Sequence, residues 1–122
     1  MAEGTRINLA QKLTQFSDHW AQRLIETVDD YEVKLAKIQG DFVWHRHSEA
    51  DELFVVLSGS LRMDFRDRQV DVSAGEIIVV PRGVEHKPFA EHECSVLLLE
   101  RAGTTNTGDG GPTERTRAPE RV

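Results

Sequence analysis

Residues 40–59 read GDFVWHRHSEADELFVVLSG, and this stretch decides the fold and the candidate chemistry. Residues 42–47 are a predicted strand, whose side chains alternate between two faces. His45 and His47 therefore leave the same face about 7 Å apart, at roughly 3.3 Å per residue. Two imidazoles at that separation can bind one ion. Taken alone, however, the motif is equally consistent with two surface histidines beside a turn.

A carboxylate follows the two histidines. The polar residues 48–51 interrupt the strand, so Glu52 begins a new strand in register with Phe54 and Val56. If those two side chains line an interior, Glu52 points inward with them, and a buried carboxylate needs a cation or strong hydrogen-bond donors. A third histidine, His86, follows the turn at residues 81–85 and begins another strand.

The rest of the chain before residue 103 is dominated by short strands between turn residues. Predicted strands cover residues 20–28, 31–39, 42–47, 53–57, 61–65, 70–72, 77–80 and 94–99, with a break at residues 40–41. Only one segment has helical spacing, with Asn8 as N-cap and Leu9, Leu13 and Phe16 on one face, and it is expected to end near residues 16–20. This pattern indicates an all-β fold, an antiparallel sandwich or barrel with one short N-terminal helix.

The motifs also fit a known pattern. Gly40, His45, His47, Glu52 and Gly59, followed by Gly75, Pro81, Gly83 and His86, resemble the two motifs of the cupin superfamily. The chain is most similar to its small single-domain members, described as cupin 2 conserved barrel or mannose-6-phosphate isomerase-like. The resemblance implies an antiparallel double-stranded β-helix, or jelly-roll barrel, in which His45, His47, Glu52 and His86 bind one divalent metal. Two departures are a four-residue spacing before the first histidine, where five is usual, and Ala90, where asparagine is usual.

Three imidazoles and one carboxylate form a mixed nitrogen and oxygen site without the soft thiolate ligands of structural zinc. Iron, manganese, nickel, zinc and copper are all chemically reasonable, and affinity order alone does not choose between them. The alternative is a metal-free remnant in which the buried histidines and glutamate bond to one another. His92 and Cys94 are weaker candidates, a structural or surface histidine and a buried small hydrophobe.

Composition sets the wider limits. The chain has 122 residues, a net charge of -6 and one cysteine. The acidic charge argues against nucleic acid or an anionic membrane surface as partner, and a single cysteine excludes an intrachain disulfide. With no apolar leader run, a cytoplasmic location is expected. We expect an N-terminal arm and helix at residues 1–19, the barrel at 20–102, and a disordered tail at 103–122, which is rich in glycine and proline.

Residues 53–57, 77–80 and 96–99 are apolar on both faces of their predicted strands. One face can line the barrel, and the other needs cover. A second copy of the chain is the expected cover, which predicts a symmetric homodimer; the alternative is that the N-terminal helix and hairpin fold over this face.

Two classes of function remain open at this level. The first is a metal-dependent enzyme, an oxygenase or isomerase acting on a small organic molecule inside the barrel. The second is a metal-containing module that binds or senses a small molecule without turnover. The sequence offers no confident general acid or base outside the four ligands, so the catalytic residues are left unassigned.

Overall fold

A computed structural model describes residues 3–111, 113 and 115–122. Its helix, α1 (Leu9–Leu13), begins where the sequence predicts, because the Asn8 side chain accepts a hydrogen bond from the Gln11 amide at 3.0 Å. It ends earlier than predicted. The Thr14 hydroxyl donates to the carbonyl of Gln11, and Phe16 lies beyond the helix in a buried position.

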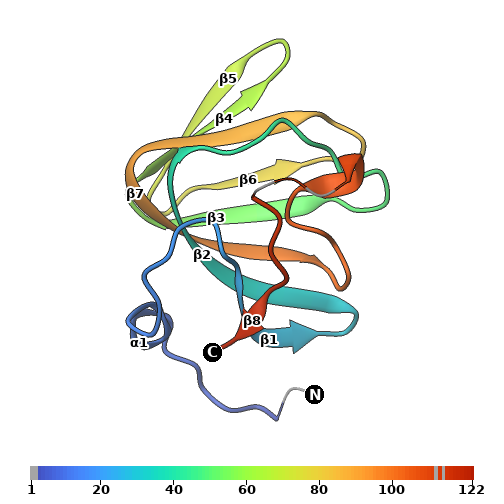
Figure 1. Ribbon diagram of the computed structural model, residues 1–122. Coiled ribbons are helices and arrows are strands. Elements are labelled where there is room, and N and C mark those ends of the chain that lie inside the picture. The colour runs from blue at the N-terminus through green and yellow to red at the C-terminus, as the bar shows by residue number, and fades with distance from the viewer. Residues whose placement is uncertain (1–2, 112, 114) are drawn as a thin grey trace.

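The strands form one eight-stranded sheet that curls into a barrel (Figure 1). Their bounds are β1 (Arg23–Val28), β2 (Tyr31–Asp41), β3 (Glu52–Ser58), β4 (Ser60–Phe65), β5 (Gln69–Ser73), β6 (Ile77–Val80), β7 (His86–Arg101) and β8 (Glu120–Arg121). The long strand β7 organises the barrel. It pairs with β2 along one edge, and along the other with β4 near its start and β3 near its end. The predicted all-β fold with one short α-helix is confirmed, although β8 pairs with β1 in parallel.

Three strand predictions were wrong in detail. Strand β2 continues through residues 40–41, because Gly40 adopts a φ of 80° at a shift in the β2–β7 register and so absorbs the irregularity. Residues 42–47 form no strand; a single bridge between His45 and His86 joins them to β7. The strand predicted to begin at His86 and the one predicted at residues 94–99 form one continuous strand, β7, whose first part pairs with β4.

The barrel interior holds the main apolar core. Trp20, Phe42, Phe54, Met63 and Leu98 are among its buried members. The turn between β3 and β4 packs closely against β7: Gly59 has a φ of 81°, and a Cβ there would lie 2.8 Å from the carbonyl oxygen of Glu93. The predicted motif glycine is therefore required both by its backbone conformation and by close packing.

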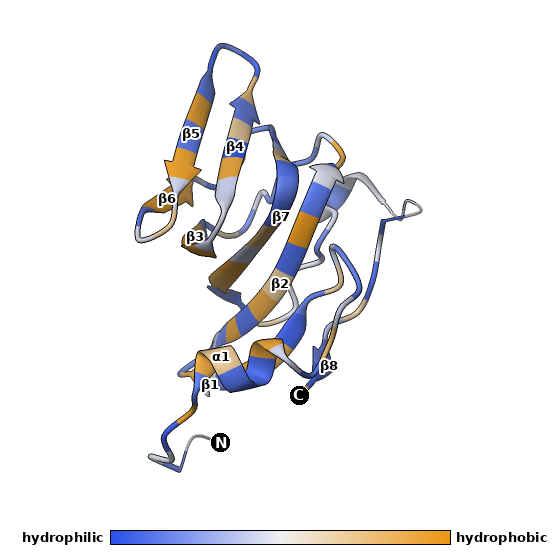
Figure 2. Ribbon diagram, turned by 90° about the vertical axis from the view of Figure 1, so that its left-hand side faces the viewer, coloured by the Kyte–Doolittle hydropathy of each residue, from blue (hydrophilic) through white to orange (hydrophobic). Residues whose placement is uncertain are grey.

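A second apolar cluster lies on the outside of the barrel beside α1. Phe16, Ile25 and Leu35 form its buried part, and Leu57 and Leu97 pack against it. On the same sheet, Ile77 and Val79 of β6 are 61% and 49% exposed. The N-terminal segment thus covers one end of the outer apolar face and leaves β6 uncovered in a single chain; β3 and β6 show as apolar strands in Figure 2.

The segment after residue 102 lies along the barrel. It contains a 3-10 turn, η1 (Gly108–Gly110), and ends in β8 beside β1. Asn106 and Thr107 are buried, which glycine- and proline-rich composition does not predict. The predicted domain boundaries remain a sequence-based division. Within the described ranges, no helix has the length and apolar character needed to cross a membrane.

Candidate metal centre

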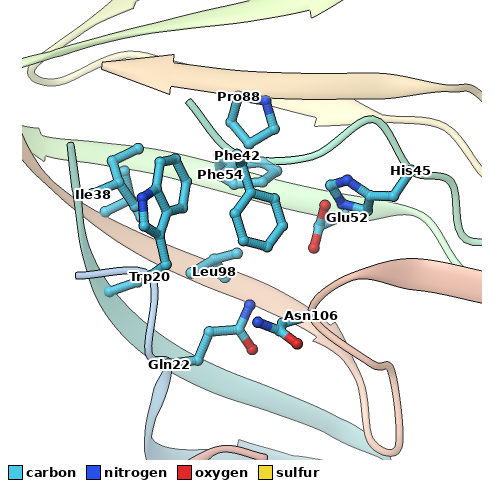
Figure 3. A pocket seen from close by; sticks show the side chains of 12 residues that line it. Trp20, Gln22, Ile38, Phe42, His45, Glu52, Phe54, Pro88, Leu98 and Asn106 are labelled. Carbon is cyan, nitrogen blue, oxygen red and sulfur yellow. The ribbon is translucent and has the colours of Figure 1, made fainter. Parts of the chain in front are cut away.

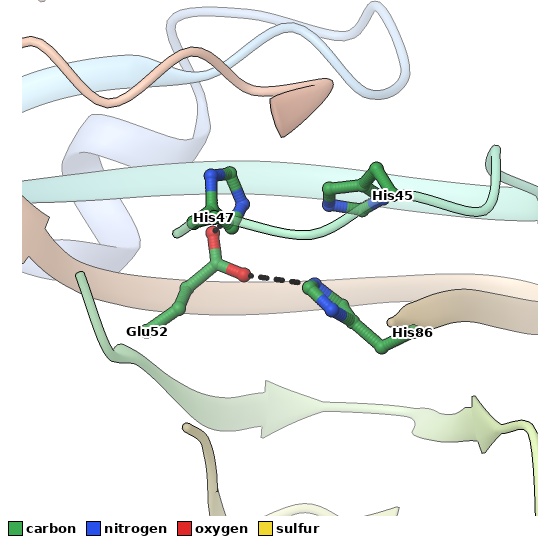
Figure 4. Close-up of side chains that lie close together, drawn as sticks. All are labelled: His45, His47, Glu52 and His86. Atoms are coloured by element: carbon green, nitrogen blue, oxygen red, sulfur yellow. Dashed lines mark ion pairs between the residues drawn. The ribbon is translucent and has the colours of Figure 1, made fainter. Parts of the chain in front are cut away.

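The four side chains singled out by spacing converge at one end of the barrel interior (Figure 4). His45 and His47 come from the connection between β2 and β3, Glu52 opens β3, and His86 opens β7. Each offers one ligand atom, and these atoms all lie within 4.8 Å of one another. The four residues are only 7%, 6%, 2% and 0% exposed, in chain order. The arrangement could hold a metal ion.

Backbone contacts fix the histidines in this arrangement. His45 and His86 exchange two backbone hydrogen bonds, of 3.0 and 2.9 Å, and the carbonyl of His47 accepts one from the Gly83 amide at 2.8 Å. The Nδ1 atoms of His45 and His86 lie 2.8 and 2.9 Å from the carbonyl oxygens of Val43 and Val84. A carbonyl can only accept a hydrogen bond, so Nδ1 carries the proton in each ring. The lone pair of Nε2 is then available to bind a metal.

The inward atoms of the cluster lack hydrogen-bond partners. Nε2 of His47, Nε2 of His86 and Oε1 of Glu52 are buried without a well-aligned bond among the described residues. Glu52 lies 3.6 Å from Nε2 of His47 and 3.3 Å from Nε2 of His86. Buried polar atoms are almost always partnered, so several unpartnered atoms aimed at one point fit a bound cation.

The protonation states suit metal binding. Burial, with the nearby His86, lowers the pKa of His45 to about 4, and burial also lowers the pKa of His47. Burial would raise the pKa of Glu52, but the contacts with His86 and Glu100 outweigh it and lower this pKa. Near neutral pH, His45 and His47 are therefore neutral and Glu52 is charged, as ligands of a cation must be.

The four ligand atoms are compatible with a class of metals rather than with one metal. Imidazole nitrogen and carboxylate oxygen suit iron, manganese, nickel, zinc or copper, and four protein ligands leave room for a further ligand in octahedral geometry. Cys94 is not part of the site. It is buried in the apolar core, where burial raises the pKa of its thiol to about 11.

A small cavity of about 30 Å³ adjoins the cluster (Figure 3). His45 and Glu52 form one wall, and the aromatic rings of Trp20, Phe42 and Phe54 form much of the rest. Two amide side chains that the sequence did not single out, Gln22 and Asn106, supply polar atoms on the opposite side. The pocket is thus mainly apolar, with a polar end at the candidate metal position. Phe54 lines this cavity, whereas the core residues Met63 and Phe65 do not.

The turn η1 crosses the connection that carries His45 and His47. The Asp109 amide donates to the carbonyl of Arg46 at 3.0 Å, and the Asp109 carboxylate accepts from the Ser48 amide at 2.8 Å. Gly108 has a φ of 76°, and a Cβ there would collide with the carbonyl oxygen of Arg46. The C-terminal segment therefore lies across the connection beside the four ligands.

The weaker candidates lie elsewhere. His92 is exposed beside a separate surface groove that also includes Arg62 and Phe89. Two other titratable groups outside the cluster also lie at the surface: Nε2 of His19 is 2.8 Å from the Glu93 carboxylate, and Glu85 forms an ion pair with Arg66.

Comparison with known proteins supports the fold. The family profile described as "Cupin domain" matches residues 31–100. A Bacillus subtilis (strain 168) protein named "Uncharacterized protein YdbB" is 36% identical over 81 residues, which are 66% of this chain and 72% of that protein. A cupin-2 domain containing protein from Shewanella frigidimarina NCIMB 400 superposes with a TM-score of 0.77 at 45% identity, over 78% of this chain and 93% of the other. Protein NMB1881 from Neisseria meningitidis gives 0.74 at 31% identity, over 80% and 100%.

Proposed function

This chain belongs to the cupin domain family, and on that premise we propose that it binds one divalent transition metal and uses it on a small organic molecule held in the barrel. His45, His47, Glu52 and His86 are the proposed ligands. The observation that carries the proposal is the set of buried, converging and largely unpartnered ligand atoms beside an apolar cavity.

The proposed reaction class is a metal-dependent oxygenation or isomerisation. A metal in such a site supplies a redox centre or a Lewis acid. The chain's own side chains do the remaining work. The rings of Trp20, Phe42 and Phe54 exclude water and favour a mainly apolar substrate, while Gln22 and Asn106 can orient a polar group on it.

A non-catalytic module that binds or senses a small molecule is the second candidate. One observation favours it. Apart from His45 and Glu52, the polar side chains of the cavity are the amides Gln22 and Asn106, which neither release nor take up protons near neutral pH. A site of this kind can recognise a ligand but offers little general acid–base catalysis.

Metal analysis of the untagged protein by inductively coupled plasma mass spectrometry tests the site. About one metal ion per chain is expected, and a metal-free protein that takes up none of the five candidate metals would refute the proposal. Oxygen uptake by the iron-loaded protein over phenolic, diketone and thiol compounds would then favour the enzyme. A ligand-dependent rise in melting temperature without turnover would favour the binding module.

We further propose that two copies pair through the uncovered apolar face around β6, and that the protein works in the cytoplasm. Exposed Ile77 and Val79 support the first proposal, because exposed contiguous apolar surface commonly marks an interface. The one cysteine, Cys94, is buried and unpaired, which supports a reducing compartment.

A further inference from the structure

A buried ion pair lies behind the candidate metal centre. Lys34 of β2 and Glu100 of β7 are both fully buried, at 0% exposure. The Lys34 ammonium lies 3.1 Å from Oε1 of Glu100, 3.3 Å from the Gln22 side-chain oxygen and 3.4 Å from Oε1 of Glu32. Lys34 is therefore held from three sides, and it holds one oxygen of Glu100 in turn.

Strand register connects this pair to the metal site. Glu52 of β3 stands directly opposite Glu100 of β7. Opposite residues on neighbouring strands point to the same side of the sheet, with Cβ atoms about 5 Å apart. Both residues are buried on this shared side of the sheet. Oε2 of Glu100 and Oε1 of Glu52 are both buried without a hydrogen-bond partner among the described residues. Glu100 therefore lies between the Lys34 ammonium, which it contacts, and Glu52, which stands opposite it on the next strand.

Stability alone is a poor reason for such a pair. Removing two charges from water costs several kcal/mol, and replacing a buried pair by apolar side chains of similar size is often neutral or stabilising. A carboxylate ligand, by contrast, gains from a fixed neighbour, because groups that contact metal ligands set their orientation. Among the described residues, no backbone group hydrogen-bonds to the Glu52 carboxylate, whereas backbone carbonyls hold the Nδ1 atoms of His45 and His86.

We propose that Glu100, anchored by Lys34, is a positioning residue that fixes the orientation of the Glu52 carboxylate toward the metal. This inference rests on the proposed metal-binding function. It assigns Glu100 no contact with the metal. The role requires a side chain of sufficient length, because it must extend from the Lys34 ammonium to the Glu52 carboxylate.

Two single substitutions distinguish the effect of the length of the Glu100 side chain from the effect of its charge. Glu100→Gln keeps the length, and its amide can contact both Glu52 and Lys34. Glu100→Asp keeps the charge but is one methylene shorter. The dissociation constants of the metal-free proteins for Zn²⁺ and Mn²⁺ would be measured by competition with a chromophoric chelator. We expect Glu100→Gln to stay within about threefold of wild type and Glu100→Asp to bind about 10- to 100-fold more weakly.

The reverse order, with Glu100→Asp like wild type and Glu100→Gln weakened, would overturn the proposal, because charge rather than position would then matter. Equal, wild-type affinity in both variants would also overturn it. Glu91→Gln, an exposed glutamate on the same strand, is the matched control and should not change affinity. If wild type itself binds neither metal, the proposed function fails instead, and the two failures are thereby distinguished.

The double variant Lys34→Met/Glu100→Leu removes the whole pair and provides a second test. Thermal unfolding of the metal-free form reports on the fold, and we expect a melting temperature at or above that of wild type. Metal affinity should nevertheless fall about 10- to 100-fold. A stable double variant with wild-type affinity would overturn the positioning role. If the double variant does not fold, the comparison of Glu100→Gln with Glu100→Asp still decides the question.

Discussion

Acid should destabilise the metal-free protein through His45. This imidazole is 7% exposed, and burial together with the neighbouring His86 lowers its pKa from 6.5 to about 4. In the unfolded chain the ring returns to its ordinary pKa. Between these two values the unfolded state binds the proton and the folded state does not, so stability falls as pH falls. The contribution is complete above about pH 6.5 and is lost progressively toward pH 4.

The size of the effect follows from the two pKa values. Between pH 7 and pH 5, the protonation of His45 in the unfolded state alone should remove about 2 kcal/mol from the free energy of unfolding. His47, whose pKa is also lowered, acts in the same direction. Glu100, whose pKa burial and the adjacent Glu52 raise, acts in the opposite direction, because its contribution is lost as pH rises. A comparison of variants is therefore needed to isolate His45.

Urea unfolding of the metal-free protein at pH 7 and pH 5, followed by tryptophan fluorescence, measures these free energies. The variant His45→Gln keeps a polar side chain that does not titrate. It should lose about 2 kcal/mol less than wild type between the two pH values. An equal loss in both proteins would show that the His45 imidazole is not held neutral by its surroundings, and would refute the reasoning.

Three further outcomes are expected. The double substitution His47→Ala/His86→Ala should abolish metal binding, measured as metal per chain, while unchanged stoichiometry would contradict the ligand assignment. Gly108→Ala places a side chain at a closely packed position with left-handed backbone conformation, so it should destabilise the turn η1 by about 1–3 kcal/mol and speed removal of metal by a chelator. The control Gly110→Ala should leave that rate unchanged, because a Cβ at residue 110 meets no neighbouring atom. Ile77→Asp should shift the protein from dimer to monomer mass in gel filtration, and a wild-type elution volume would argue against pairing through this face.

The fold class and the first three members of the metal cluster were predictable because they depend on short-range patterns, whereas His86 was added to the set through the resemblance to the cupin motifs. The two-residue spacing of His45 and His47, and the new strand phase at Glu52, are local features. The motif glycine at position 59 is likewise local, since it is needed at one turn. The cluster nevertheless forms without the predicted strand at residues 42–47. The bridge between His45 and His86, the bond from the Gly83 amide to the His47 carbonyl and the Nδ1 contacts of two rings hold it instead.

Other features depend on register between distant strands, and local patterns do not contain that information. Lys34 and Glu100 are 66 residues apart in the chain and meet only because β2 and β7 pair. A charged residue within an apolar strand is normally predicted to face solvent, because charged side chains are rarely buried without a partner. Asn106 is a similar case, because its place in the cavity wall depends on how the C-terminal segment returns to the barrel.

That returning segment has a kinetic consequence. Near the cavity it is held mainly by hydrogen bonds at Ser48 and Asp109, and few apolar side chains anchor it, so it belongs to the part of a fold that opens at low free-energy cost. Its amide protons should exchange with deuterated solvent much faster than those in the middle of β7. Entry of an ion or ligand would then be limited by the frequency of this opening, and its measured association rate would level off at high concentration rather than rise in proportion.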